Sequence, residues 1–226
     1  TIDASIVNIA LPVLEQDLGA DFALVEWVVL AYLVTVTTLM LSIGRLADMM
    51  GKRSIFVGGM VVFTVGSVLC GLAQHIAILI AFRVLQGVGA AMIMALSSAI
   101  ITEAFPASER GRALGISGLC VSVGIIAGPT LGGLILGVLS WHWIFFVNLP
   151  LGIAGVVMTL RFVPTGRPVD GQSFDLPGAA CLFVALRALL LSISMGQTRG
   201  YARAEVIALF GVFVVLLPLF LIIESR

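Results

Sequence analysis

The chain has few charged side chains for its length. Of its 226 residues, 11% are Asp, Glu, Lys or Arg, whereas 60% are hydrophobic, and the formal net charge is zero. A soluble domain usually carries about 25% charged residues, so too little polar surface is present to cover a water-soluble globule. Together with the mean hydropathy of +1.19, this predicts an integral membrane protein whose solvent is the lipid bilayer.

The sequence also lacks the clustered side chains of metal, disulfide and catalytic sites. Its three cysteines, Cys70, Cys120 and Cys181, lie far apart in apolar runs, which argues against a disulfide framework and predicts small buried side chains. Neither histidine has a Cys, Asp or Glu at ligand spacing, so we predict no metal and no cofactor. No Ser/His/Asp, Cys/His or phosphate-loop pattern is present, which excludes a soluble enzyme, and no basic run indicates nucleic acid.

Apolar runs separated by short connections predict eight transmembrane helices. A helix needs about 20 apolar residues to cross the hydrocarbon core, and the breaks between runs carry turn residues such as Gly19, Gly51, Pro106 and Gly200. The fold class predicted is therefore an all-α membrane bundle. We place its spans at residues 1–18, 24–44, 54–73, 77–101, 112–138, 142–162, 175–196 and 204–223.

Basic residues are distributed unequally between the connections. The connections after the first, third and fifth spans hold no Lys or Arg. The connection after the seventh span is an exception, because it holds Arg199 and Arg203. Because cytoplasmic connections carry an excess of Lys and Arg, the even-numbered spans are predicted to end in the cytoplasm. The basic residues after these spans are Arg45, Lys52, Arg53, Arg110, Arg112, Arg161 and Arg167.

The connection after the second span carries a motif. It reads Gly44-Arg45-Leu46-Ala47-Asp48-Met49-Met50-Gly51-Lys52-Arg53 and resembles the signature between the second and third helices of the major facilitator superfamily. Glycine permits tight turns and close backbone approach at Gly44 and Gly51. Asp48 can accept from a facing helix N-terminus or pair with Arg45, Lys52 or Arg53. The resemblance implies a cytoplasmic latch between two halves of a transporter; the alternative is an ordinary charged turn.

Four further segments resemble the fourteen-helix drug:proton antiporters of this superfamily, the EmrB/QacA type. They are residues 1–12, 82–91, 124–133 and 141–152, with Ser5 and His142 replacing the usual Thr and Arg. Matches at Phe174-Asp175, Gly178 and Glu224 are looser.

The resemblance implies a domain organisation and a function. Residues 1–162 would be the N-terminal six-helix bundle with a truncated first helix, and residues 163–226 a cytoplasmic connection and two linker helices. The C-terminal bundle would be absent, and the first apolar run opens at Thr1 without a signal peptide, so we expect a fragment. The implied function is proton-coupled efflux of drug-like or lipophilic molecules, lipophilic cations included, across the cytoplasmic membrane of a bacterium.

Two charged residues inside predicted spans suggest how protons are coupled. Asp3 lies roughly 20 Å before the outer connection at 1.5 Å per residue, where burial favours proton uptake. Arg83 needs a partner in the protein interior, and Asp3, Gln86 and backbone carbonyls are candidates. The hypothesis is that Arg83 tunes the proton affinity of Asp3. The alternatives are a capping or interface role for Asp3 and a purely structural one for Arg83.

The fifth span carries glycines on one helical face. Gly124, Gly128 and Gly132 follow one another at spacing four, Gly133 is adjacent, and Pro129 removes an amide donor and bends the helix. Such a face allows a neighbouring backbone to approach closely. The stripe is either an interface between the two halves that restricts leakage or an ordinary packing face.

The substrate cavity is predicted to contain aromatic and adaptable side chains, because aromatic faces bind lipophilic cations and Met adapts to varied shapes. Trp27 can instead be an interface anchor, the role predicted for Trp141 and Trp143. Arg187, in the middle of the seventh span, has no assigned role. The cavity candidates are Asn8, Trp27, Tyr32, Gln86, Met92 and Met94.

Two alternatives to drug efflux remain open at the level of sequence. A metabolite or nutrient transporter of the same superfamily would share these helices and motifs. A non-transporting truncated membrane protein or sensor would share the composition. Because alternating access needs two bundles that rock about a central site, residues 1–226 alone are not expected to transport.

Overall fold

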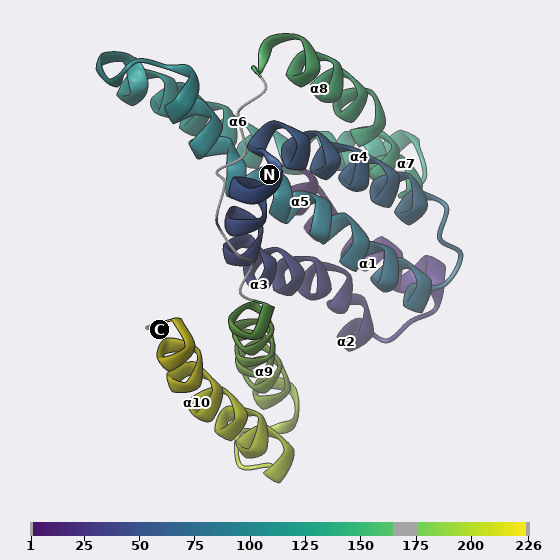
Figure 1. The fold of residues 1–226 in the computed structure, drawn as a ribbon. Coiled ribbons are helices and arrows are strands. Elements are labelled where there is room, and N and C mark those ends of the chain that lie inside the picture. The colour runs from purple at the N-terminus through teal and green to yellow at the C-terminus, as the bar shows by residue number, and fades with distance from the viewer. Residues whose placement is uncertain (1, 165–175, 225–226) are drawn as a thin grey trace.

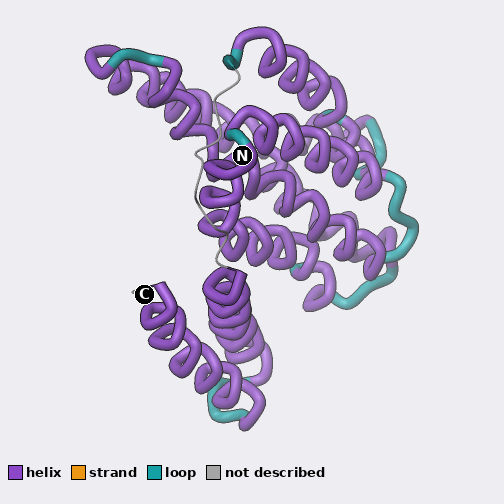
Figure 2. Tube along the Cα trace, in the orientation of Figure 1, coloured by secondary structure: helices purple, strands orange, loops and turns teal. Residues whose placement is uncertain are grey.

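A computed structural model describes residues 2–164 and 176–224 of the chain (Figure 1). Every regular element in these residues is a helix, and Figure 2 shows them joined by short loops and turns. The predicted all-α fold is confirmed. The helices are α1 (Ile2–Leu18), α2 (Phe22–Val25), α3 (Trp27–Met50), α4 (Lys52–Gly71), α5 (Ile76–Ala104), α6 (Ala107–Val138), α7 (His142–Phe146), α8 (Asn148–Phe162), α9 (Leu176–Arg199) and α10 (Ala204–Glu224).

Several helices extend beyond the predicted apolar spans. α6 begins at Ala107 rather than at residue 112, because Pro106 caps the helix and charged residues continue it past the apolar run. α3 likewise runs through the charged motif to Met50. Gly51 then adopts φ +91°, a backbone conformation that L side chains rarely adopt. The tight turn predicted at Gly51 is therefore present.

Two predicted spans are each divided into two helices. Glu26 separates α2 from α3 and Val147 separates α7 from α8, but both residues keep a right-handed helical backbone. Pro150 has no N–H to donate to the preceding turn, which accounts for the second break. Each pair therefore continues in one direction.

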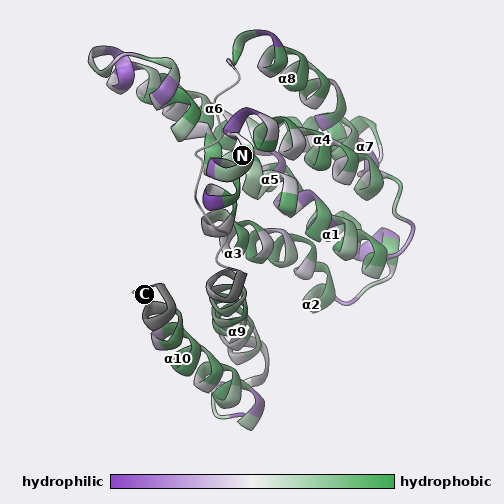
Figure 3. Cartoon of the chain, viewed as in Figure 1, coloured by the Kyte–Doolittle hydropathy of each residue, from purple (hydrophilic) through white to green (hydrophobic). Residues whose placement is uncertain are grey.

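Among the described residues, five segments are long and apolar enough to cross a bilayer: Phe22–Met40, Lys52–Gly71, Ile76–Ala104, Ala107–Val138 and His142–Phe162. α1 has 17 residues, and the apolar stretches Phe183–Gly196 and Ala204–Phe220 are, like α1, shorter than these five segments. Figure 3 shows hydrophobic residues along the helices and most hydrophilic ones near helix ends and connections. The protein is an integral, polytopic membrane protein.

The position of α5 depends on close contact with its neighbours. It packs against α3 and α4, while α4 also contacts α7 and α8, and α1 lies along α6. A Cβ at Gly66 of α4 would lie 2.8 Å from the Cα of Gln86, and one at Gly89 of α5 would collide with the backbone of Phe63. Small residues at these points let the two backbones approach, which brings the polar side chains of α5 against α4.

Two side chains are placed differently from their predictions. Trp141 is 1% exposed and stacks on His142 with ring centroids 3.8 Å apart. Its predicted place in an outer aromatic belt is wrong, because α7 turns this residue into an apolar core; Trp143 is half-exposed. Cys70 is buried as predicted, but Cys120 is exposed on the largely exposed α6.

α9 and α10 form a hairpin beside the other helices (Figure 1). The hairpin contacts α3, and Gly200, with φ +92°, lies in its turn. Arg187 is exposed on α9 and pairs with no described residue. Phe174 and Asp175, and the side chain of Glu224, lie outside the described residues. The division into domains near residue 162 stays a prediction, as does the membrane orientation.

Candidate functional site

A cluster of polar side chains is buried where α1, α4, α5 and α8 meet. Asp3 is 3% exposed, Arg83 and Gln86 are 0% exposed, and Asn148 is 5% exposed. Burying an ionised group is costly unless that group is paired and hydrogen-bonded. The contacts within the cluster therefore decide what it can do.

Arg83 and Asp3 form a direct ion pair. Arg83 Nη1 donates to Asp3 Oδ2 at 2.7 Å and to Gln86 Oε1 at 2.7 Å, and Arg83 Nε donates to the Val28 carbonyl at 2.9 Å. The guanidinium carbon also lies 4.1 Å from the centroid of the Tyr32 ring, a cation–π contact. The partners proposed for Arg83 from the sequence, namely Asp3, Gln86 and a backbone carbonyl, are all present.

The Asp3 carboxylate accepts two further hydrogen bonds. Gln86 Nε2 donates to its Oδ1 at 2.9 Å, and Asn148 Nδ2 donates to the same oxygen at 2.8 Å. Three N–H groups thus point at one carboxylate, two at Oδ1 and one at Oδ2. In this conformation the cluster pairs Asp3 with Arg83.

Two members of the cluster were not singled out from the sequence. Asn148 comes from the start of α8, and its Nδ2 also donates to Ser67 Oγ at 2.9 Å. Ser67, on α4, donates to the Phe145 carbonyl at 2.9 Å. The available signal was a polar amide and a hydroxyl inside apolar runs; periodicity alone did not show that Asn148 faces Asp3 and that Ser67 faces Asn148.

A separate cavity of about 530 Å³ lies between α1, α3 and α9. Asn8, Glu26, Trp27 and Ser194 line it together with apolar side chains such as Leu30 and Ile193. A mostly apolar cavity with a few polar groups is typical of small-molecule sites. Asn8 and Trp27 therefore share one cavity, and its use by a substrate stays a prediction.

The other four predicted cavity residues lie elsewhere. Tyr32 is buried against Arg83, and Gln86 belongs to the Asp3 cluster. Met92 packs against Gly58 and Gly59 of α4, and Met94 is 43% exposed. Their placement follows from the α3–α5 and α4–α5 contacts, which turn one face of α5 inward and leave Met94 on the surface.

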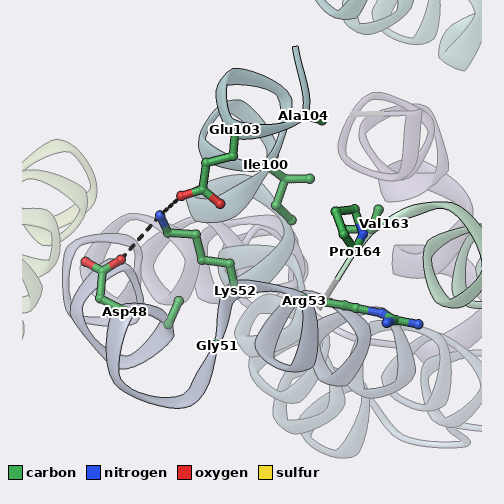
Figure 4. Close-up of a pocket in the computed structure, with 10 residues that line it drawn as sticks. Asp48, Gly51, Lys52, Arg53, Ile100, Glu103, Ala104, Val163 and Pro164 are labelled. Carbon is green, nitrogen blue, oxygen red and sulfur yellow. Dashed lines mark hydrogen bonds and ion pairs between the residues drawn. The ribbon is translucent and has the colours of Figure 1, made fainter. Parts of the chain in front are cut away.

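The charged motif between α3 and α4 forms a small network (Figure 4). Lys52 Nζ pairs with Glu103 at the end of α5 and lies 3.5 Å from Asp48 Oδ1. Arg53 Nη2 donates to the Leu160 carbonyl of α8. A cavity of about 140 Å³ lies among these residues. The turn is thus tied to α5 and α8 within this chain, and its predicted action as a latch between two halves stays a prediction.

Arg45 and Gly44 of the same motif lie on α3. Arg45 is exposed, and a Cβ at Gly44 would meet nothing within 4 Å. Close backbone approach is therefore not the role of Gly44 among the described residues.

The glycine stripe of α6 faces α1. A Cβ at Gly128 would collide with Ser5 Oγ, and one at Gly132 would lie 3.0 Å from Ile6 Cγ1. Gly124 is buried on the same face, whereas a Cβ at Gly133 would meet nothing within 4 Å. Pro129 lies inside α6. In this chain the stripe is a helix-packing face toward α1, and Gly133 does not belong to it.

No group of three His, Cys, Asp or Glu side chains gathers among the described residues.

The sequence matches a known family and several curated proteins. The profile described as Major Facilitator Superfamily matches residues 1–225. The riboflavin transporter RibZ of Clostridioides difficile (strain 630) is 38% identical over 214 residues, which are 93% of this chain and 46% of that protein. The multidrug transporter protein MdtP of Bacillus subtilis (strain 168) is 33% identical over 226 residues, 100% of this chain and 42% of that protein.

A third relative is the multidrug resistance protein Stp of Mycobacterium tuberculosis (strain CDC 1551 / Oshkosh). It is 37% identical over 226 residues, 100% of this chain and 42% of that protein. The chain thus spans a little under half the length of these curated relatives.

Among solved structures, an inward-facing and occupied bacterial homologue of the human lysosomal transporter Spinster superposes with a TM-score of 0.53. The two sequences are 19% identical, and the match covers 97% of this chain and 57% of the other. At this identity the likeness shows the fold.

Proposed function

Because the chain belongs to the major facilitator superfamily, we propose that it is part of a proton-coupled exporter of drug-like or lipophilic small molecules. The observation that carries this proposal is the buried ion pair between Asp3 and Arg83. We place the protein in a bacterial cytoplasmic membrane and in the fourteen-helix branch of the superfamily, to which its motifs are similar.

The coupling step follows from the electrostatics of the pair. A proton on Asp3 removes the negative charge that balances Arg83, and a buried charge without its partner is strongly unfavourable. The protonated state therefore favours a different arrangement of the helices that meet at the cluster. A ligand, here a proton, shifts a conformational equilibrium by the difference in its affinity for the two states.

The cavity between α1, α3 and α9 supplies the substrate side of the proposal. Trp27 offers an aromatic face and Glu26 a carboxylate at the same cavity, a combination that suits an apolar cation. Two of the relatives described above are named as multidrug proteins, which supports a lipophilic substrate. Alternating access requires two bundles, so the whole activity is proposed for a protein that contains both.

A second candidate is export or uptake of a planar metabolite. The relative with 38% identity is named as a riboflavin transporter, and a flat ring system stacks well on an aromatic side chain such as Trp27. The same cavity would then bind a neutral ring through stacking and hydrogen bonds to Asn8 and Ser194.

The test is transport by the native full-length protein in proteoliposomes under an imposed pH gradient. We expect proton-driven movement of a fluorescent lipophilic cation, and loss of that movement in Asp3→Asn with substrate binding retained. The matched control is Thr159→Val, a buried polar residue of α8 outside the cluster, which should transport normally. Dye transport that does not depend on the pH gradient, or that is unchanged in Asp3→Asn, would overturn the proposal. Transport of riboflavin but not of the dye would favour the second candidate.

A further inference from the structure

We infer that Asn148 is a positioning residue for the proton site: it is the donor that gives way when Asp3 takes up a proton. The inference rests on the proposed function, because it concerns the same carboxylate. It adds to that function the group that sets the pH of protonation and the helix, α8, that responds to it.

The orientation of the Asn148 amide is fixed by its partners. One N–H donates to Asp3 Oδ1 at 2.8 Å and the other to Ser67 Oγ at 2.9 Å. The Ser67 O–H is already committed to the Phe145 carbonyl, so its lone pair faces Asn148. A flipped amide would place its oxygen against the carboxylate, since only the NH₂ group of an amide donates.

The three donors occupy three of the about four lone-pair sites of the Asp3 carboxylate. Oδ1 faces the amide N–H groups of Gln86 and Asn148, and Oδ2 faces Nη1 of Arg83. A proton can take the remaining site on Oδ2, but it removes the negative charge that makes hydrogen bonds to a carboxylate strong. The neutral carboxyl therefore holds each donor less tightly, and the donor with room to turn is the one that is released.

The surroundings select Asn148 as the donor that moves. Arg83 is held by the Val28 carbonyl and the Tyr32 ring, and Gln86 is 0% exposed and also accepts from Arg83. Asn148 instead lines a cavity of about 220 Å³ together with Asp3, Thr64 and Gly152. That cavity gives the amide room to turn, and because Asn148 begins α8, its release loosens the tie between α8 and α1.

Few other titratable groups face Asp3. Among the described residues they are Arg83 on α5, Tyr32 on α3 and Cys70 on α4. On α7, His142 contacts Ser140 and Trp141 instead. Tyr and Cys side chains are ordinarily neutral below about pH 8, so we assign the proton of the cluster to Asp3.

Infrared difference spectroscopy on the full-length protein tests the inference. The C=O stretch of protonated Asp3 is identified by its loss in Asp3→Asn, and its half-intensity pH is then measured in variants. Asn148→Leu removes one hydrogen bond to the anion, so the midpoint should move upward by about one to two pH units. Asn148→Ser keeps a donor and should recover part of the shift, and Ser67→Ala should give a smaller upward shift.

The outcomes separate this inference from the proposed function. Thr159→Val, also on α8, is the control and should leave the midpoint unchanged. Unchanged midpoints in Asn148→Leu, Asn148→Ser and Ser67→Ala would overturn the role of Asn148 while leaving Asp3 as the proton site. If Asp3→Asn removes no pH-dependent carboxyl band, the proposed function itself fails.

Discussion

Replacing Arg83 with Leu is expected to lower the free energy of unfolding by about 3–5 kcal/mol, because it leaves an uncompensated buried charge. Asp3 is 3% exposed, so water cannot replace the lost partner without rearrangement. Leu occupies part of the arginine volume, which keeps the packing contribution small.

The individual contacts of Arg83 set the size of the effect. The hydrogen bonds to the Val28 carbonyl and Gln86 are lost in every variant without the guanidinium and contribute about 1 kcal/mol each. The remaining part depends on Asp3. In the double variant Asp3→Asn, Arg83→Leu no charge is left buried, so a double-mutant cycle should give a coupling energy of about 1–3 kcal/mol.

The dependence on pH has a definite sign. In Arg83→Leu the unpaired carboxylate is unfavourable only while it is charged, so the deficit relative to wild type should shrink as pH falls. Arg83→Lys keeps the charge but not the planar fork of donors, and its deficit should be smaller at neutral pH.

The assay is denaturant unfolding of the full-length protein in detergent at several pH values. A deficit in Arg83→Leu that is equal with and without Asp3→Asn, and equal at every pH, would refute the electrostatic reasoning. In that case Arg83 would stabilise the fold only through packing and its neutral contacts.

Three further predictions follow from packing and surface charge. Trp141→Ala should cost about 3–5 kcal/mol of unfolding free energy, whereas the half-exposed Trp143→Ala should cost clearly less; equal losses would contradict the burial of Trp141. Gly128→Ala should cost about 1–3 kcal/mol by overpacking the α1–α6 contact, and Gly133→Ala, which points into open space, should be close to neutral by the same measurement. Lys52→Ala removes a partly exposed ion pair and should cost at most about 1 kcal/mol, less at high salt. A large loss of unfolding free energy in Lys52→Ala that does not change with salt would contradict the interpretation of this contact as a solvent-screened ion pair.

The sequence was a good guide where one physical property varied along the chain. Apolar runs predicted a helix at each of the eight places, and among the described residues five segments are long and apolar enough to cross a bilayer, which imposes a similar length on every crossing. The ends were less well placed: α3 and α6 continue through charged residues that hydropathy counts as connections. Gly51 was predicted to turn and does so with φ +91°, because this property depends on the residue itself.

For the candidate site, the sequence likewise identified some residues correctly but did not show how their side chains are oriented. Asp3 and Arg83 could be selected from the sequence because a charge in an apolar run demands a partner. Trp27 and Asn8 share a cavity, but Tyr32 and Gln86 face the ion pair. Trp141 is buried although its sequence neighbourhood is typical of an interface. Residue type alone does not say which way a helix face turns.

The sequence by itself determined that this protein is a bundle of membrane helices of the major facilitator type, with most charges in the connections and a few inside the spans. Composition, run length and local motifs act over neighbouring residues, so no tertiary contact is needed to read them. Only the tertiary structure decided that Asn148 donates to Asp3, 145 residues away in the chain, and to Ser67, 81 residues away. Such contacts depend on how helices rotate and pack against each other, which a one-dimensional pattern does not contain.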